Sequence, residues 1–488
     1  MKWVRFLCRL SLALSVSLVG CEGPPDPFAG TRELVAEALA DGVASISLAV
    51  ARDGEVIWEE GFGWANREKE IAASENTAYS LASITKPMTA TALMILVERE
   101  LVDLDRPINE YLGEAGLQSP LGHLEEATVR RVASHTSGLP LHYQFFYADE
   151  EFLPPSREET IRRYGKLLTL PGELYNYSNL GYGILDHLIA RVSGKSYPDF
   201  MRDEVYSPLG LTHTSINPPQ IAEDLVAVRY SSEGNPLPFY DFDHAGGSAA
   251  YSSAHDLIRF ALFHMNGASA EQTAILSDAT RSTMKQPEQG RSYALGWSQG
   301  TVPGQPGTTG HSGGMGGVST LMTLVPERNI ALVVLSNSSS RYPSRIQQML
   351  VHELLPGDFP LPAAPGQDSS EPAQFVPTQE LLGEWSGEVE TYQGNRSLDL
   401  RVEPFGRVQV RFQGSEWIGL NDVEFEDGFM RGQFPADIGT EDSSRRPHNL
   451  RLYLKLRGDR LNGACTSMSL PAEKIGNALS HWVELEKK

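Results

Sequence analysis

The sequence predicts an α+β fold: an antiparallel sheet flanked by helices, with a largely helical insertion, followed by a small C-terminal β-barrel or sandwich. Three observations lead to this prediction. Period-two alternation of apolar residues, typical of strands, occurs at 46–58 and again at 318–335. Helical spacing dominates between these two regions. After a stretch rich in Pro, Ala and Ser, only strand-like alternation remains.

The outer elements of the first domain are helices and hairpins. Residues 31–41 carry apolar side chains at helical spacing and predict a helix. Alternating runs at 46–50 and 56–58 flank Asp53-Gly54, a dipeptide that favours a two-residue hairpin turn. Residues 318–325 and 330–335 predict two more strands, and 345–354 predicts a helix after them. Because these strands come from both ends of the domain, we expect one antiparallel sheet.

The middle of this domain predicts mainly helices. The segments 86–98, 180–192 and 257–265 have apolar residues at helical spacing. Ser253 and Asp256 form a capping-box pattern ahead of the third segment.

Composition divides the rest of the chain. Residues 357–378 are rich in Pro, Ala, Ser, Gln and Asp and predict a linker. Residues 379–488 contain short alternating runs, such as 398–402 and 450–456, and predict the β-rich domain. Its Gly383-Glu384-Trp385 string resembles the opening of lipocalin barrels. Residues 30–356 then form the α+β domain.

The N-terminus predicts export. Residues 1–20 combine a basic start with a short apolar run, which predicts a signal peptide rather than a membrane span. Leu18-Val19-Gly20-Cys21 resembles a bacterial lipobox, which implies cleavage before Cys21 and lipidation of its thiol; the alternative is an ordinary signal peptide that includes a Cys. Residues 21–29, with three prolines, predict a tether. We therefore expect a lipid-anchored protein of the bacterial cell envelope, on its periplasmic or extracellular face.

Composition also excludes several classes of function. A net charge of −21 repels phosphate backbones, so we expect no nucleic-acid partner. Beyond Cys8 and Cys21 only Cys465 remains, which excludes a disulfide framework within one chain. The 12 histidines are scattered and form no His-Glu-x-x-His string, so we expect no metal and no other cofactor.

The string Ser83-Ile84-Thr85-Lys86 supplies a nucleophile and a base for acyl transfer. It follows a polar turn and leads into the predicted helix 86–98, so Ser83 falls at a helix N-terminus with Lys86 on the same face. The helix dipole and burial both disfavour a protonated Lys86 and lower its pKa. Ser282-Thr283-Met284-Lys285 has the same spacing but lies at a helix end, and we interpret that pair as surface residues.

Two later strings complete the set. Tyr177-Ser178-Asn179 precedes a predicted helix, and a Tyr is a poor base unless a cation such as Lys86 lies close. His311-Ser312-Gly313 opens a Gly-rich approach to a strand, where backbone N–H groups can stabilise an oxyanion. Residues 310–314 also match the G-x-S-x-G nucleophile motif, which requires a helix after it. Strands follow here, so we reject Ser312 as the nucleophile.

With these strings the sequence resembles the serine β-lactamase and penicillin-binding-protein superfamily, in its class C-related branch of esterases, D-aminopeptidases and D-Ala-D-Ala carboxypeptidases. The resemblance spans about residues 30–355 and leaves the β-rich tail uncovered. It is supported by four further strings: LDRP at 104–107, SHTSGLP at 134–140, PLGL at 208–211 and GGS at 246–248. It implies a β-lactamase-like fold, Ser83 as nucleophile, Lys86 and Tyr177 as proton carriers, and a fold-supporting role for His135.

The resemblance also implies the substrate side of the site. Asn179 orients substrate or Lys86, His311 heads the strand that lines the site with Gly313 and Gly314, and the N–H groups of Ser83 and Gly314 form an oxyanion hole. One departure concerns His311, which stands where β-lactamases and most penicillin-binding proteins carry the Lys of Lys-Thr-Gly or Lys-Ser-Gly. The loss of a fixed cation weakens the case for β-lactam or D-Ala-D-Ala substrates. We expect His311 to be neutral or charged near pH 7, with a pH-dependent contribution.

The sequence therefore predicts a serine hydrolase that forms an acyl-enzyme with an ester or amide, of esterase or D-amino-acid peptidase type. Its expected partners are a small-molecule or peptidoglycan-like acyl substrate and, through the lipid, a membrane. Lys86 and Tyr177 both stay candidates for the base. The alternatives are a non-hydrolytic penicillin- or peptidoglycan-binding lipoprotein and a true β-lactamase. An aromatic segment predicts an apolar acyl pocket, with coverage of the core as the alternative: Tyr143, Phe145, Phe146, Tyr147 and Phe152.

Overall fold

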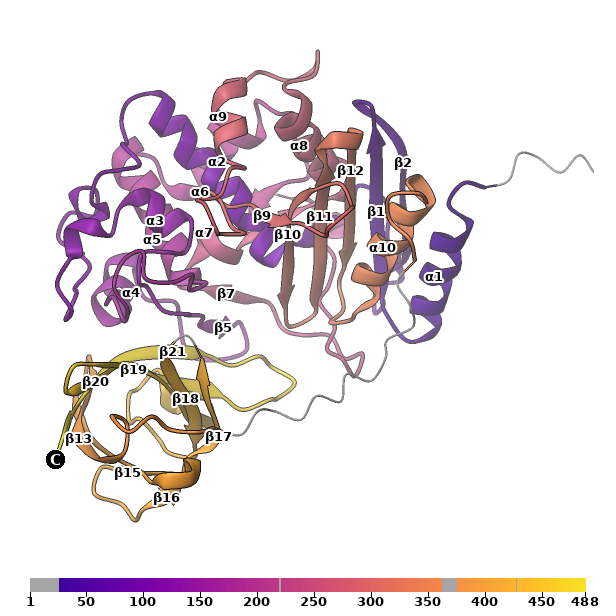
Figure 1. Cartoon of the computed structure of the whole chain (residues 1–488). Coiled ribbons are helices and arrows are strands. Elements are labelled where there is room, and N and C mark those ends of the chain that lie inside the picture. Colours follow the sequence, from indigo (N-terminus) through magenta and orange to yellow (C-terminus); the bar gives the residue numbers. More distant parts are fainter. Residues whose placement is uncertain (1–25, 219–220, 362–374, 427) are drawn as a thin grey trace, which may run out of the picture.

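A computed structural model describes residues 26–218, 221–361, 375–426 and 428–488. The predicted signal segment, Cys21 and most of the predicted linker lie outside the described residues. Figure 1 shows an α+β domain and, beside it, a C-terminal domain built of strands. Among the described residues, no helix combines the length and apolar character that a bilayer crossing requires.

The α+β domain contains a seven-stranded antiparallel sheet formed by both of its ends. Its strands run in the order β3 (Ile71–Ala72), β2 (Glu55–Asn66), β1 (Ser45–Arg52), β12 (Ile330–Ser336), β11 (Val318–Val325), β10 (Thr308–Met315) and β9 (Ser298–Gly300). The predicted hairpin turn is present, with positive φ at Asp53 and Gly54. β1 pairs with β12, for example at Val50 and Leu332, which confirms the predicted union of the two ends.

Helices cover both faces of this sheet (Figure 1). On one face, α1 (Ala29–Ala40) and α10 (Tyr342–Leu354) pack on one set of alternating residues, including Ile46, Leu48 and Val334. On the other face, α8 (Ala254–Asn266) packs on the opposite set, such as Ala49 and Val333. The alternation in the sequence therefore separates two layers of core, as period-two burial requires.

The insertion is largely helical, as predicted. Its centre is α2 (Thr85–Glu98), in which every residue from Thr85 to Leu96 is buried because neighbouring elements surround it. The other helices are α3 (Val129–Ala133), α4 (Arg157–Tyr164), α5 (Asn179–Ser193), α6 (Tyr197–Phe200), α7 (Ala245–Ser248) and α9 (Asp278–Thr283). Short strands accompany them: β4 (Tyr79–Ser80), β5 (Phe145–Tyr147), β6 (Ser215–Ile216), β7 (Tyr240–Phe242) and β8 (Ala250–Ser252).

The C-terminal domain is one nine-stranded antiparallel sheet that curls into a nearly closed barrel (Figure 1). The strands are β13 (Gly383–Thr391), β14 (Gly394–Val402), β15 (Val408–Phe412), β16 (Ile418–Gly419), β17 (Asn421–Glu426), β18 (Phe429–Phe434), β19 (His448–Arg457), β20 (Arg460–Ser469) and β21 (Ala478–Lys487). Trp385 and the predicted alternating residues, such as Leu400 and Leu452, fill its interior. Cys465 is buried there, and burial raises its thiol pKa to about 12, so the thiol stays protonated.

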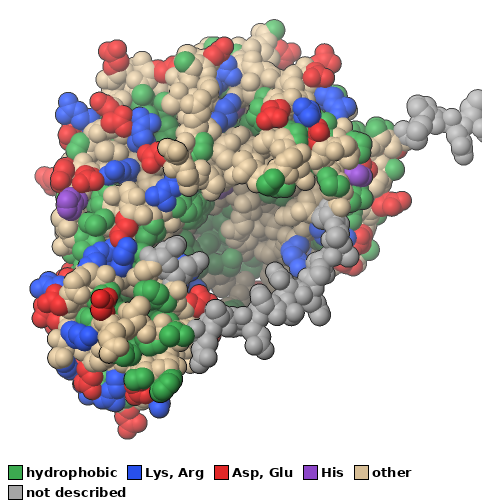
Figure 2. Space-filling model, viewed as in Figure 1, with side chains coloured by type: hydrophobic (Ala, Val, Ile, Leu, Met, Phe, Trp, Pro, Cys, Tyr) green, Lys and Arg blue, Asp and Glu red, His purple; other side chains and the backbone are tan. Residues whose placement is uncertain are grey.

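The barrel is docked onto the α+β domain by contacts that include β19 and β21. Tyr143 and Ala478 exchange two backbone hydrogen bonds, of 3.1 and 2.9 Å. Glu173 bridges to Lys455 (2.6 Å) and Arg457 (2.5 Å) of the barrel. These contacts join the barrel to the loops that precede β5 and α5. Figure 2 shows the surface hollowed where the two domains meet.

Candidate active site

Ser83 lies in a single 3₁₀ turn, Ala82–Ile84, directly before α2. Ala82 adopts φ +49°, and its carbonyl accepts a 2.6 Å hydrogen bond from Thr85 Oγ1. Thr85 Oγ1 in turn accepts from the Ala250 N–H (3.0 Å), which ties the turn to β8. The predicted position at the start of a helix is therefore close to the observed one, but the turn rather than α2 itself presents the hydroxyl.

Lys86 is fully buried, and its amine lies among three polar partners. Nζ is 3.1 Å from Ser83 Oγ, 2.8 Å from Asn179 Oδ1 and 2.9 Å from the Gly247 carbonyl. Burial lowers the pKa of Lys86 well below its ordinary value, because the ammonium form loses its hydration. The neutral amine thus becomes accessible as a proton acceptor beside Ser83.

Tyr177 lies over the same amine, with its ring centroid 4.7 Å from Lys86 Nζ. Burial raises the pKa of Tyr177 well above its ordinary value, although its hydrogen bond to Ser83 lowers that pKa in part. The phenol is therefore protonated at neutral pH. The structure brings Ser83, Lys86 and Tyr177 together in one place.

Asn179 and His135 hold this group from the side of α5. Asn179 begins the helix, and its Nδ2 donates to the His142 carbonyl (2.9 Å), which turns Oδ1 toward Lys86. Ser178 caps the helix by accepting from the Gly181 N–H (3.0 Å). His135 Nδ1 accepts from the Ser178 N–H (3.1 Å), and its ring packs 4.4 Å from that of Tyr177. His135 thus positions the tyrosine.

His311 lies on β10 with both ring nitrogens engaged. Nδ1 donates to the Ser312 carbonyl (2.7 Å), and Nε2 accepts from the Tyr293 hydroxyl (3.0 Å). Burial, helped by the nearby Lys86, lowers its pKa to about 3. Of the two charge states that the sequence left open, His311 is therefore neutral near pH 7, because burial disfavours the charged ring, and the expected pH dependence of its contribution near pH 7 is wrong.

Gly313 and Gly314 bring β10 against the nucleophile turn. A Cβ on Gly313 would lie 2.1 Å from the Leu81 carbonyl oxygen, so only glycine allows this approach. Among the described residues β9 pairs only with Thr308 to Gly310, so it leaves the edge of β10 beside Ser83 uncovered. Gly314 and Ser83 line the same cavity. The predicted pair of oxyanion donors therefore belongs to adjacent segments.

The two decoy motifs lie elsewhere. Ser312 is exposed on β10 and is not among the residues that line the cavity beside Ser83, and the element after β10 is the strand β11. Ser282 is exposed on α9. The expectation of a surface position is wrong for Lys285, which is partly buried and donates to the His264 carbonyl.

The cavity beside Ser83 has a volume of about 310 Å³. Tyr143 and Phe145 of the aromatic segment line it, and Ile475 from the β20–β21 loop of the barrel completes the wall. Phe146 and Phe152 instead line a separate cavity beside Arg445 of the barrel. The predicted acyl pocket is therefore wrong for these two, because Phe146 faces the opposite side of β5 from Phe145 and Phe152 lies beyond the strand.

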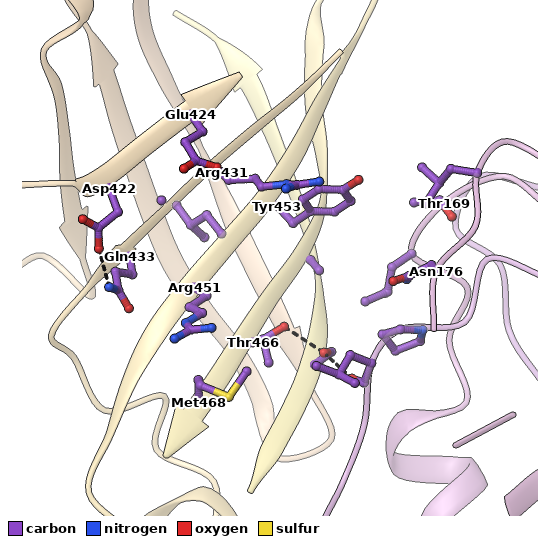
Figure 3. Close-up of a pocket in the computed structure, with 18 of the residues that line it drawn as sticks. Thr169, Asn176, Asp422, Glu424, Arg431, Gln433, Arg451, Tyr453, Thr466 and Met468 are labelled. Atoms are coloured by element: carbon purple, nitrogen blue, oxygen red, sulfur yellow. Dashed lines mark hydrogen bonds between the residues drawn. The ribbon is translucent and has the colours of Figure 1, made fainter. Parts of the chain in front are cut away.

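A larger cavity, of about 590 Å³, lies between the barrel and the loops that lead to Tyr177. Figure 3 shows Arg451, Thr466 and Met468 of the barrel on one side, with Thr169 and Asn176 on the other. Leu141 lines both this cavity and the one beside Ser83. The two cavities therefore share Leu141 as a lining residue.

Sequence reasoning missed four contributors to the site: His244, the Gly247 carbonyl, Tyr293 and Ile475. Gly247 belongs to a string that supported the resemblance, and Asp243-His244 precedes it directly, so proximity to that string was an available signal. No sequence signal marked Tyr293 and Ile475 as site residues, because their roles arise only when distant segments fold together.

Comparison with known proteins agrees with this geometry. Residues 31–352 match the Beta-lactamase family model. The chain is 25% identical over 317 residues to Protein flp of Staphylococcus aureus (strain COL), a match that covers 63% of this chain and only 62% of that protein. It is 25% identical over 407 residues to Penicillin-binding protein 4* of Bacillus subtilis (strain 168), covering 74% of this chain and 86% of that one.

Among solved structures, the octameric penicillin-binding protein homologue from Pyrococcus abyssi has a similar fold, with a TM-score of 0.58 and 22% identity. That match covers 94% of this chain and 99% of the other, and so includes the barrel. The chain belongs to the beta-lactamase family, within the superfamily of serine β-lactamases and penicillin-binding proteins. The family is one of serine hydrolases.

Proposed function

We propose that this protein is a serine hydrolase that forms an acyl-enzyme on Ser83 with an ester or amide, as an esterase or D-amino-acid peptidase would. One observation carries the proposal: the buried amine of Lys86 lies 3.1 Å from Ser83 Oγ. A low-pKa amine beside a hydroxyl is the arrangement that activates a serine for attack on a carbonyl.

Lys86 is the proton acceptor in this proposal. Its pKa is lowered by burial, whereas that of Tyr177 is raised, so at neutral pH the amine is the stronger candidate to take the Ser83 proton. Oγ then bonds to the carbonyl carbon, and the phenol of Tyr177 donates a proton to the leaving group and recovers one from Lys86. Asn179 and the Gly247 carbonyl keep the amine in place during both transfers.

The N–H groups of Ser83 and Gly314 serve as the oxyanion donors. They lie on the two segments that Gly313 brings into contact, and both residues line the cavity. Backbone donors fixed before reaction stabilise the tetrahedral oxyanion without reorganisation, and one such donor contributes about 100- to 1,000-fold in rate.

The cavity favours substrates with a neutral acyl group. Among the described residues that line it there is no Arg or Lys, and Tyr143, Phe145 and Ile475 make one wall apolar. His311 is neutral and both its nitrogens are engaged, so it supplies no cation for a substrate carboxylate. Simple esters therefore fit better than β-lactams, even though relatives are named penicillin-binding proteins.

A fluorophosphonate probe tests the proposal. We expect covalent labelling of the wild-type protein, loss of labelling in Ser83→Ala, and full labelling in the matched control Ser312→Ala. Hydrolysis of p-nitrophenyl butyrate should exceed that of a chromogenic cephalosporin. Absence of labelling in the wild-type protein would indicate a non-hydrolytic binder, and faster turnover of the cephalosporin would indicate a β-lactamase.

We also propose that lipidated Cys21 anchors the enzyme in the bacterial cell envelope, where peptidoglycan-like acyl groups are within reach. The lipobox-like string at 18–21 supports this location. Expression in a bacterial host should place the wild-type protein in the membrane fraction and Cys21→Ala in the aqueous fraction. Equal partition of the two proteins would refute the anchor.

A further inference from the structure

A buried carboxylate behind the site holds two imidazoles. Asp243 is fully buried, His142 Nε2 lies 2.8 Å from its Oδ2, and His244 Nδ1 lies 2.7 Å from its Oδ1. In the amide orientation that satisfies both neighbours, Gln144 also donates to Oδ2 (3.0 Å). Burial raises the pKa of Asp243, but its two histidine partners outweigh burial and hold that pKa well below its usual range. Asp243 is therefore an ionised acceptor.

The other nitrogen of His244, Nε2, is not used in the bond to Asp243. Because Nδ1 donates to Asp243, Nε2 carries the lone pair of the neutral ring. The described residues make no hydrogen bond to Nε2, and the side chain is 1% exposed. A Cβ placed on Gly247 would lie 3.4 Å from His244 Cδ2, the atom next to Nε2, and Gly247 is the residue whose carbonyl binds Lys86.

The ring reaches the cavity itself. His244 lines the 310 Å³ cavity together with Ser83, Tyr177 and Gly314. The main chain of α5 makes room for it, because a Cβ on Gly183 would lie 2.9 Å from His244 Cβ. A histidine that is held by a buried carboxylate, lines the cavity of a nucleophile and keeps one nitrogen unbonded is suited to general-base catalysis.

We infer that His244, oriented by Asp243, is the base that activates the water for hydrolysis of the acyl-Ser83 intermediate. This inference rests on the proposed function. In the step, Nε2 takes a proton from water, and the water oxygen bonds to the acyl carbonyl carbon. The bond from that carbon to Ser83 Oγ then breaks, the acid is released, and the imidazolium proton returns to Oγ through the Lys86 amine. Lys86 and Tyr177 thus move the protons of acylation, whereas His244 activates the water of deacylation and Lys86 only relays the proton back to Oγ.

The test separates these two half-reactions with p-nitrophenyl acetate. For His244→Gln we expect a burst of p-nitrophenol at the wild-type rate, followed by turnover reduced by about 100-fold or more. Intact-protein mass spectrometry should then find the acetyl group accumulated on Ser83. Asp243→Asn should show the same pattern. The matched control is His255→Gln, because His255 also contacts a carboxylate, Glu59 (3.0 Å), but lies outside the cavity.

Adding imidazole to the His244→Ala variant distinguishes the loss of a base from misfolding. His244→Ala should regain turnover when imidazole is supplied, which a merely misfolded variant would not do. Unchanged turnover in His244→Gln, or an equal loss of burst rate and turnover, would overturn the inference while wild-type labelling at Ser83 leaves the proposed function intact. Loss of wild-type turnover in EDTA, restored by zinc, would instead make the His142, Asp243 and His244 cluster a metal site and also overturn it.

Discussion

Gly313 of β10 lies directly against Leu81, two residues before Ser83: a Cβ on Gly313 would lie 2.1 Å from the Leu81 carbonyl oxygen. The same Cβ would lie 2.3 Å from Thr320 Oγ1, which itself donates to that carbonyl (2.9 Å). The strand and the turn therefore meet through backbone atoms, and the position of Ser83 depends on the absence of a side chain at Gly313.

Gly313→Ala should reduce kcat/KM by about 100-fold, because a displacement of about 1 Å between nucleophile and oxyanion donors has an effect of that size. Gly307→Ala is the matched control, since Gly307 directly precedes β10, does not line the cavity, and a Cβ there meets nothing within 4 Å. Kinetics on p-nitrophenyl esters check the pair. Equal activity of the two variants would show that the turn tolerates displacement.

Lys86 should set the acid limb of the pH profile. Burial lowers its pKa well below 10.5, so kcat/KM should rise with pH through that lowered value as the amine loses its proton, and plateau well before pH 10.5. His311 is already neutral, with a pKa of about 3, so His311→Gln should leave the limb in place. Lys86→Arg, which stays charged, should lose about 100- to 10,000-fold in activity. A limb near pH 10 would contradict this assignment.

Phe145 and Phe146 should differ in their effect on substrate choice. Phe145 lines the cavity beside Ser83, whereas Phe146 packs beside Arg445 at the domain boundary, with 4.4 Å between the guanidinium carbon and the ring centroid. Phe145→Leu should shift the ratio of kcat/KM for long over short p-nitrophenyl esters by about tenfold. Phe146→Leu should leave this ratio unchanged. The cavity assignment would be wrong if the two variants shifted it equally.

Glu173 should stabilise the docked barrel. Its carboxylate is only 15% exposed and bonds to Lys455 and Arg457. Burial raises its pKa, but these cations outweigh burial and lower it overall. A lowered pKa means that the contribution is present above the unfolded value of about 4.3 and is lost as the pH falls through the folded value.

Glu173→Gln should therefore lower the free energy of unfolding by about 1.5–3 kcal/mol at pH 7. Glu390→Gln is the control, because its pair with Lys166 (2.5 Å) also crosses the interface but Glu390 is 43% exposed, and such pairs contribute below about 1 kcal/mol. Chemical denaturation at pH 7 measures both. Equal losses would mean that burial does not distinguish these pairs.

Sequence predicted the fold where local patterns are strong. The alternation near Ile46 and Val318 placed the strands, and the three-residue spacing of Ser83 and Lys86 placed two groups on one face. The proximity of Tyr177 followed from a family resemblance rather than from spacing. Local pattern alone carries no information on which distant loops meet.

The parts that sequence did not predict depend on tertiary packing. The charge state of His311 follows from burial and from Lys86, which lies on another segment. The separation of Phe145 from Phe146 follows from the pairing of β5 with β7, which fixes which face each residue presents. Ile475 lines the cavity only because the barrel docks onto the α+β domain. The change of composition along the chain separates these two domains but does not predict a contact between them.

Ile475 reaches the cavity from a domain that holds none of the proposed proton-transfer groups. Exchange of the β20–β21 loop between relatives would accordingly alter which acyl groups are accepted while the reaction chemistry stays the same. In this architecture, the choice of acyl group can thus vary separately from the cleavage reaction. New substrate preferences can arise from changes in the C-terminal barrel, far along the chain from Ser83.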